Sequence, residues 1–359
     1  MADGLSAADL NAELAKSTAA VLAHGRPDGY PVSLAAQIHL TTSRLQADHP
    51  DAAALLSALA LLAPEPFPVT TCAGHLPDQA STPLTHALAT PLTARPTLHA
   101  LTRHSLARAH DGTLQLHRLT QAVVADQLAP DQHQQAQRDA EALLIAATPG
   151  DVGDPPIWPA WRVLLPHLLA VDPAHLTTTA ARNGVRDACW YLMDRGQAHP
   201  ARDRLQQLYD TWSAQLGPDH EDTLWTAHYL AQAHGDTQDP ERARALDEDT
   251  LQRRRRLLGE DHPDTLLTAS NLAVRLAALG EARALGEETL ARQRRVLGED
   301  HPDTLRTAYN LAIWLAELGE TGEARALGEE TLLRRRRVLG EDHPDTLTTV
   351  QLVEWLEQQ

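Results

Sequence analysis

Residues 297–338 read LGEDHPDTLRTAYNLAIWLAELGETGEARALGEETLLRRRRV, and this stretch decides the fold of the C-terminal half. Its opening pattern, LG-x-DH-x-DTL, begins at Leu216, Leu258, Leu297 and Leu339, at intervals of 42, 39 and 42 residues. Repeats of this length are typical of helical hairpins that stack side by side, because one hairpin cannot bury its apolar stripe alone. The sequence therefore predicts an array of helix pairs.

Apolar residues within this unit recur every three or four positions, as they do on one face of an amphipathic helix. They are Leu305, Ala308, Leu311, Leu315 and Leu318 in the first half, and Ala324, Leu327, Leu332 and Val338 in the second. Pro302 suits the first position of a helix, and Gly319 suits a helix end. We expect a carboxylate ahead of each such proline, as at Asp261, to accept the free amides of the helix start.

Residues 310–327, which fit NLAxxLAxLGxxxEAxxL, resemble the tetratricopeptide repeat, and the 42-residue period with its DHPDT opening is similar to the kinesin light chain variety. Alanines occupy the positions where the resemblance implies close helix packing: Ala231 with Ala243, Ala273 with Ala282, and Ala312 with Ala324. It implies an α-α superhelical solenoid. The middle repeat has lost three residues in its turn, where we expect a local change in the groove.

By this resemblance, the first helix of each hairpin lines a concave groove that binds a protein or peptide. The positions that would face this groove are Trp225, His228, Gln232, Ser270, Asn271, Arg306, Tyr309, Asn310 and Ile313. Asparagine can hydrogen-bond both the donors and the acceptors of an extended main chain, and Trp and Tyr offer flat apolar area that anchors interfaces. The alternative is that Asn271 and Asn310 only brace neighbouring helices.

The chain is acidic, with 31 basic and 48 acidic side chains and a formal net charge of −17, which disfavours a general affinity for nucleic acid or anionic membranes. Lys16 is the only lysine and lies in no GxxxxGK[ST] loop, so we expect no ATP hydrolysis. The sequence shows no HExxH pair, no GxSxG serine elbow and no paired-carboxylate signature, so we expect no enzyme activity. The longest apolar stretch, residues 52–63, is too short to span a membrane. Cys72 and Cys189, interpreted as core thiols, fit a cytoplasmic protein.

Three arginine-rich runs, residues 253–256, 292–295 and 334–337, lie near the ends of the predicted second helices. An acid stands four residues before the first arginine of each run, at Asp249, Glu288 and Glu330. This spacing favours an ion pair on one helix face, and residues 216–359 hold 17 basic and 28 acidic side chains. We interpret the runs as solvated helix faces and not as nucleic-acid sites. The 19 histidines show no zinc-binding spacing, so no metal site is predicted.

Asp111-Gly112 marks a β-hairpin in the N-terminal half, because this dipeptide favours the tight turn between antiparallel strands. The expected strands are residues 106–110 and 113–117. Helical patterns precede and follow this hairpin, and that order is typical of a winged-helix domain, which we expect over residues 34–128. DNA binding is disfavoured because these residues include five basic and six acidic side chains. A local basic patch of Arg95, Arg103 and Arg108 is the alternative that would permit it.

The stretches SLAAQIHLTTSRLQADHPDAAALLSALALLAPEPFPV (33–69) and LQLHRLTQAVVADQL (114–128) resemble the regulatory winged helix of bacterial NB-ARC proteins of the STAND class. These proteins are switch ATPases that carry C-terminal repeats. The resemblance places His117 at the histidine of the family's Met-His-Asp motif, which touches the β-phosphate of bound ADP, while Leu116 and Arg118 replace the other two residues. The alternative is a structural histidine that closes the wing.

The predicted organisation is therefore mainly α and has four parts. They are a remnant of the helical NB-ARC module (1–33), the winged helix (34–128), a helical linker arm (129–176), and a tetratricopeptide array of one degenerate hairpin, three full repeats and one terminal helix (177–359). The preferred hypothesis is the non-catalytic sensor portion of a STAND regulator. It would have no cofactor of its own, and ADP or ATP would take part only if a nucleotide-binding domain is supplied. A stand-alone adaptor and a winged-helix transcription factor are the alternatives.

Overall fold

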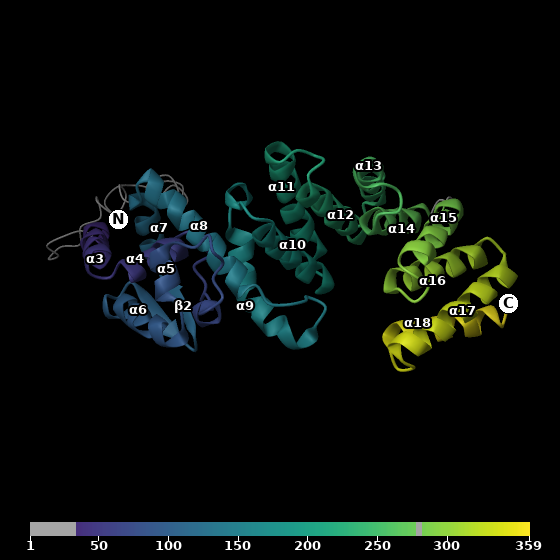
Figure 1. The fold of residues 1–359 in the computed structure, drawn as a ribbon, viewed down its shortest axis with the longest axis horizontal. Helices are drawn as coiled ribbons and strands as arrows, with labels where there is room; N and C mark the ends of the chain where they lie inside the picture. Colours follow the sequence, from purple (N-terminus) through teal and green to yellow (C-terminus); the bar gives the residue numbers. More distant parts are fainter. Residues whose placement is uncertain (1–33, 278–281) are drawn as a thin grey trace, which may run out of the picture. The chain divides into compact units, whose positions relative to one another are not determined.

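The computed structural model describes residues 34–277 and 282–359, and it forms two compact units, one ending at Tyr191 and one running from Leu192 to Gln359 (Figure 1). The chain is mainly helical, as predicted, with one two-stranded sheet among the described residues. The expected helical remnant at residues 1–33 and the shortened turn at residues 278–281 lie outside the described residues.

The first unit consists of short helices around one β-hairpin. In chain order its elements are α3 (Leu34–Asp48), α4 (Pro50–Ala60), α5 (Thr82–Ala87), α6 (Pro91–Arg103), β1 (Ala107–His110), β2 (Thr113–Leu116), α7 (Arg118–Gln127), α8 (Pro130–Ala147), α9 (Trp158–Ala170) and most of α10 (Thr179–Asp194). Single 3-10 turns lie at Val69–Cys72, Pro155–Ile157 and Pro173–His175. The boundary between the two units falls inside α10.

The hairpin turns at Asp111-Gly112, as the sequence predicts. Both residues have positive φ, 44° and 77°, which is the backbone shape of the tight turn favoured between twisted antiparallel strands. The register pairs Ala107 with Leu116 and His110 with Thr113, so each strand is one residue shorter at its outer end than predicted. Phe67 also bridges to Leu114, which holds the segment after α4 against β2.

Buried polar side chains fix the helices of the first unit. The Gln121 amide on α7 donates to three carbonyls at the end of α4, those of Leu59, Leu62 and Ala63. On α8, the buried Asp139 carboxylate accepts from the Ser81 main-chain N–H at 2.7 Å, ahead of α5. The buried Glu141 carboxylate accepts the main-chain N–H groups at 177 and 178, at 3.0 and 2.7 Å, where α10 starts. Helix α8 therefore satisfies the free amides of two other helix starts.

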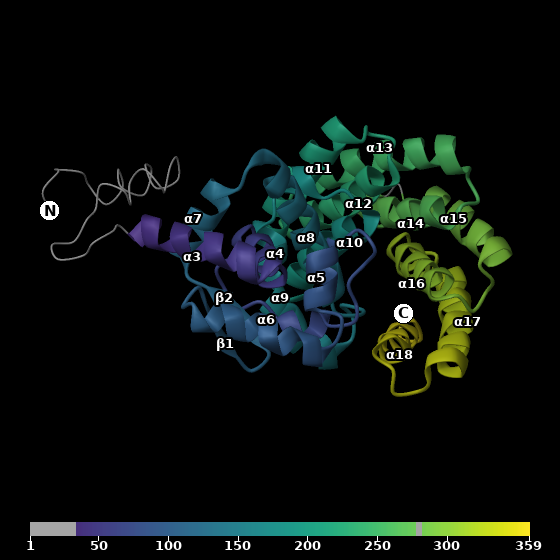
Figure 2. The ribbon, with the colours of Figure 1, turned by 60° about the vertical axis from the view of Figure 1, so that its left-hand side comes forward.

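The second unit is a succession of antiparallel helices, each packed against its neighbours in the chain (Figures 1 and 2). They are α11 (Ala198–Gln215), α12 (Glu221–Asp236), α13 (Pro240–Leu258), α14 (Pro263–Ala277), α15 (Ala282–Val296), α16 (Pro302–Glu317), α17 (Thr321–Leu339) and α18 (Pro344–Leu356). Helices α12, α14 and α16 are the first helices of three hairpins, and α13, α15 and α17 are their second helices. Gly259, Gly298 and Gly340 follow the second helices with φ near 90°, a conformation that glycine adopts without steric cost.

Most of the predicted apolar stripe is buried, including Leu305, Leu311 and the alanine pair Ala312 and Ala324. The prediction is wrong for Leu318 and Val338, which are 49% and 45% exposed. Both lie at the end of a helix, one just after α16 and one in the last turn of α17. The apolar repeat in the sequence therefore extends beyond the packed part of each helix.

Candidate functional site

The predicted contact residues lie on the three successive first helices of the second unit. Arg306 is exposed, and six others are partly exposed: Trp225, Gln232, Asn271, Tyr309, Asn310 and Ile313. His228 and Ser270 are buried, at 8% and 1% exposure. The Ser270 hydroxyl hydrogen-bonds to the Thr307 hydroxyl at 2.8 Å, so it joins α14 to α16 and is closed to a partner in this structure.

Two buried arginines position the aromatic side chains of this face. From α13, the Arg254 guanidinium lies 4.5 Å from the centre of the Trp225 ring, and its Nη1 donates to the Asp264 carbonyl and the Thr268 hydroxyl of α14, at 2.9 and 2.8 Å. Each second helix that carries such an arginine is thereby tied to the next first helix.

Arg335 makes the equivalent polar contacts in the third repeat, and it lies against a ring at a different repeat position. Its guanidinium lies 4.9 Å from the Tyr309 ring centre, and Nη1 donates to the Asp345 carbonyl and the Thr349 hydroxyl of α18, at 2.7 and 2.8 Å. A ring held against a guanidinium gains cation–π stabilisation and loses rotational freedom.

The middle repeat breaks this pattern, because Gln293 occupies the position of Arg254 and Arg335. Gln293 is fully buried, and neither its amide nitrogen nor its amide oxygen has a hydrogen-bond partner among the residues that the structure describes. An unsatisfied buried amide costs stability. The joint between α15 and α16 is therefore weaker in polar contacts than the joints on either side.

The two asparagines of the first helices make no side-chain hydrogen bond to any residue that the structure describes. Asn271 and Asn310 occupy equivalent positions in consecutive repeats, and no partner for either amide is found within residues 34–277 and 282–359. Gln232, by contrast, is fixed by the Arg275 guanidinium, which donates to its amide oxygen at 3.3 Å and to the Ala231 carbonyl at 3.1 Å. The asparagine amides are thus free to bind another chain.

Burial controls the charge of the groups beneath this face. It lowers the pKa of His228 to about 3, and the nearby Arg254, Arg306 and Arg275 act in the same direction, so the imidazole is neutral near pH 7. Burial also raises the pKa of Asp247 to about 6, although its ion pair with Arg275, at 3.1 Å, opposes that rise. The surroundings of His228 are therefore cationic.

Histidines cap the first helices, and the prediction that the aspartate before each proline does so is wrong. The Nδ1 atoms of His220, His262, His301 and His343 each accept the main-chain N–H two residues later, at 3.1 to 3.2 Å. The aspartates that precede the first three of these histidines have different partners. They lie in the turns between the hairpins, where arginines of the following second helix reach them.

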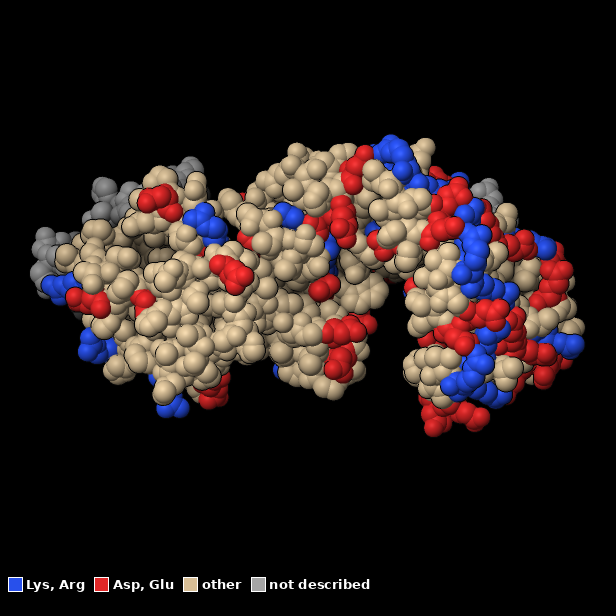
Figure 3. All heavy atoms as spheres, viewed as in Figure 1, with Lys and Arg blue, Asp and Glu red and all other residues tan. Residues whose placement is uncertain are grey.

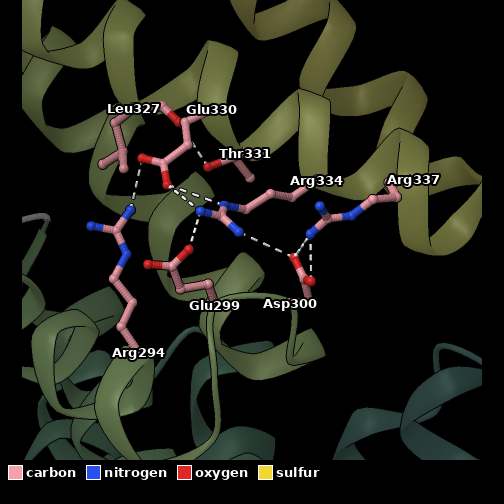
Figure 4. A network of polar contacts seen from close by, with 8 residues as sticks. All are labelled: Arg294, Glu299, Asp300, Leu327, Glu330, Thr331, Arg334 and Arg337. Atoms are coloured by element: carbon pink, nitrogen blue, oxygen red, sulfur yellow. Dashed lines mark hydrogen bonds and ion pairs between the residues drawn. The ribbon is translucent and has the colours of Figure 1, made fainter.

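Figure 4 shows one of these turns, in which Asp300 meets Arg334 and Arg337 of α17, and Arg334 also contacts Glu299. Asp261 meets Arg292 and Arg295 in the same way, at 3.0 and 2.6 Å, and Asp219 meets Arg253 and Arg256 at 2.8 and 2.6 Å. The predicted pairs four residues apart are confirmed at 2.7 to 3.1 Å. Acidic and basic side chains consequently alternate on the surface of this unit in Figure 3, as ion-paired faces do.

In the first unit, His117 caps α7, and its Nδ1 accepts the Leu119 N–H at 3.2 Å. It lines a cavity of about 670 Å³ together with His104, Arg108 and Arg118. Arg108, Arg118 and the acidic Glu65 thus line the cavity at the position where the resemblance places a phosphate contact. No cluster of three or more metal-binding side chains occurs in the described ranges.

Residues 223–264, 265–303 and 304–345 each match the tetratricopeptide repeat family. These three units are tetratricopeptide repeats. Among solved structures, the chain is similar to a Podosopora anserina protein described as a kinesin light chain with nearly identical TPR-like repeats, at 25% identity over 52% of this chain and 87% of that chain, with a TM-score of 0.44. A single-residue variant of that protein gives a TM-score of 0.45. The chain is also similar to BtubC (BKLC) from P. vanneervenii, at 18% identity over 59% and 83% of the two chains, with a TM-score of 0.42.

Tetratricopeptide repeats are protein–protein interaction scaffolds, typically non-catalytic, so the array is a surface for binding another protein. None of the curated proteins matches the chain. Of the helices described, none is long and apolar enough to cross a membrane.

Proposed function

We propose that the tetratricopeptide array binds a protein or peptide on the accessible side of α12, α14 and α16. Asn271 and Asn310 carry the proposal. They occupy equivalent positions of consecutive repeats, are partly exposed, and make no side-chain hydrogen bond within the described part of the chain. An amide of this kind can donate to and accept from an extended main chain, and it costs nothing internally to redirect.

Trp225 and Tyr309 support the same face as anchors. Each ring lies against a buried arginine, at 4.5 and 4.9 Å, so little rotamer freedom remains to be lost on binding. Arg306, three residues before Tyr309 on α16, adds an exposed cation. The partner would contact these residues with Gln232 and Ile313, whereas His228 and Ser270 would support the face from below.

Affinity capture with the full chain as bait tests this proposal. The test variant is Asn271→Ala/Asn310→Ala, which removes no internal hydrogen bond and should stay folded. The matched control is Gln252→Ala, which deletes an exposed amide from the second helix α13. We expect proteins that are retained by the wild type and the control to be lost from the double variant. An unchanged set of retained proteins would contradict the proposal.

We propose further that the first unit is the winged helix of a STAND-type regulator, which relays partner binding to a nucleotide-binding domain. Its order of α4, α5, α6, the β1–β2 hairpin and α7 supports this interpretation. The exposed His117 supports it as well, because a neutral ring whose Nδ1 accepts a hydrogen bond carries its proton on Nε2. That Nε2–H could donate to a phosphate oxygen of ADP held by the other domain.

An antibody against the array, used on extracts of the source cells, separates this regulator from a stand-alone adaptor. A native product much larger than 39.2 kDa that yields a GxxxxGK[ST] peptide by mass spectrometry supports the regulator. A product of 39.2 kDa that co-purifies with no nucleotide-binding protein favours the adaptor.

A further inference from the structure

The acidic turns of the second unit follow one rule at three successive positions. Asp219, Asp261 and Asp300 each bind two arginines, three residues apart, on the second helix that follows. The arrangement depends on a helix packed beside the turn, because each aspartate is 31 to 37 residues away from its arginines in sequence.

A fourth acidic turn, Glu341-Asp342, stands at the same position before α18. Both side chains are exposed, and neither meets a basic side chain in the part of the chain that the structure describes. Helix α18 itself contains no Lys or Arg. The turn therefore presents the acidic half of an arrangement whose basic half is supplied by a helix at the other three positions.

Apolar residues of α18 are exposed next to this turn, whereas an equivalent residue of each of the other three helices is buried. Leu224, Leu266 and Leu305 are equivalent residues of α12, α14 and α16, and they are 5%, 1% and 3% exposed. Their counterpart on α18, Leu347, is 48% exposed, and Trp355 on the same helix is 46% exposed. Each buried leucine belongs to a helix that has a second helix packed on it.

One position on α18 differs in charge from the inner repeats. Ala231, Ala273 and Ala312 are fully buried, and Ala312 lies with Ala324 of α17 in one apolar cluster. The equivalent residue of α18 is Glu354, which is exposed. A helix that packs here must bring a cation to this carboxylate, because an unpaired charge is costly to bury.

We propose that the surface formed by Glu341, Asp342, Leu347, Glu354 and Trp355 is a docking site for a basic amphipathic helix of another protein. That helix would carry arginines three residues apart against the acidic turn, apolar side chains against Leu347, and a further cation against Glu354. The site is separate from the face on which the proposed function depends. Loss of one would leave the other intact.

A fluorescent peptide with the sequence of α17, Thr321–Leu339, carrying Ala324→Arg, is the probe. We expect anisotropy to show binding to the full chain that weakens with added salt. The double variant Glu341→Arg/Asp342→Arg should weaken it at least about tenfold, since it turns two attractions into repulsions. The control is Glu241→Arg, a single charge reversal at an exposed residue of α13, which should leave binding unchanged.

A peptide in which Arg334 and Arg337 become glutamate should fail to bind the wild-type chain and should bind the Glu341→Arg/Asp342→Arg chain. This rescue depends on the pairing itself and not on the folding of the variant. The proposal is overturned if the probe does not bind the wild-type chain, or if it binds the double variant and the Glu241→Arg control equally well.

Discussion

Arg335 of the joint between α17 and α18 is equivalent to Gln293 of the middle repeat. Replacement of Arg335 by glutamine therefore gives this joint the residue that the middle repeat has. Arg335 is 4% exposed, and its Nη1 donates to the Asp345 carbonyl and the Thr349 hydroxyl at 2.7 and 2.8 Å. The shorter glutamine cannot reach both groups. We therefore expect Arg335→Gln to weaken the packing of α18 against α17.

The magnitude follows from two opposing contributions. Two hydrogen bonds from a charged donor contribute about 3–6 kcal/mol together, and the contact with the Tyr309 ring adds roughly 0.5–1 kcal/mol. Burial lowers the pKa of Arg335, which shows that the buried charge carries a desolvation cost that the neutral glutamine avoids. We expect a net loss of about 2–3 kcal/mol.

Native-state hydrogen exchange of the full chain, read by mass spectrometry on peptides from α18, measures this loss locally. This readout suits repeat arrays, which can open from one end. Exchange of α18 should be roughly 30- to 150-fold faster in Arg335→Gln. The matched control is Arg336→Gln, the same change at the exposed neighbouring arginine, and it should exchange at the wild-type rate. Equal exchange in the two variants would refute the assigned role of Arg335.

Two further predictions concern buried groups of the same unit. Gln293→Arg should raise the free energy of unfolding by about 1 kcal/mol, because the arginine can make the bonds that the buried amide lacks, and a lower urea midpoint would contradict this. Acidification from pH 7 to pH 5 should cost the wild type about 2 kcal/mol more than His228→Gln, as measured by urea unfolding at the two pH values. The sign follows because the folded pKa of His228, about 3, lies below the unfolded value of 6.5, so its stabilising contribution is present above pH 6.5 and is lost as the pH falls towards 3. An equal pH dependence of the two proteins would show that His228 takes up a proton without unfolding.

Local sequence rules predicted the elements of the fold. The period of the LG-x-DH-x-DTL pattern predicted the hairpin array, and Asp111-Gly112 predicted the turn between β1 and β2. The ion pair from Glu330 to Arg334 was also predictable, because both residues lie on one helix, four positions apart. Each of these features depends on residues close together in the chain.

The contacts between repeats were not predicted, because they join residues far apart in sequence. Asp300 and Arg334 are 34 residues apart, and nothing local distinguishes the aspartate that binds arginine from one that caps a helix. The run 334–337 contains four identical residues, of which only Arg335 is buried. One signal was present: glutamine replaces arginine at 293, the buried position of the middle run.

Some of the predicted contact residues are buried and others are partly exposed, although all lie on the first helices. Positions 228 and 270 are equivalent in the first two repeats and are buried, whereas Tyr309, at the same position in the third, is partly exposed. Position in the repeat alone therefore does not decide which residues a partner could reach.

Titration of a protein recovered by affinity capture against the full chain tests the central claim most directly. Isothermal calorimetry would compare the wild type with Asn271→Ala/Asn310→Ala and Gln252→Ala. Two central contacts of about 1 kcal/mol each correspond to a loss of roughly tenfold or more in affinity, which the double variant should show and Gln252→Ala should not. Wild-type affinity in a folded double variant would contradict partner binding through the accessible face of α14 and α16.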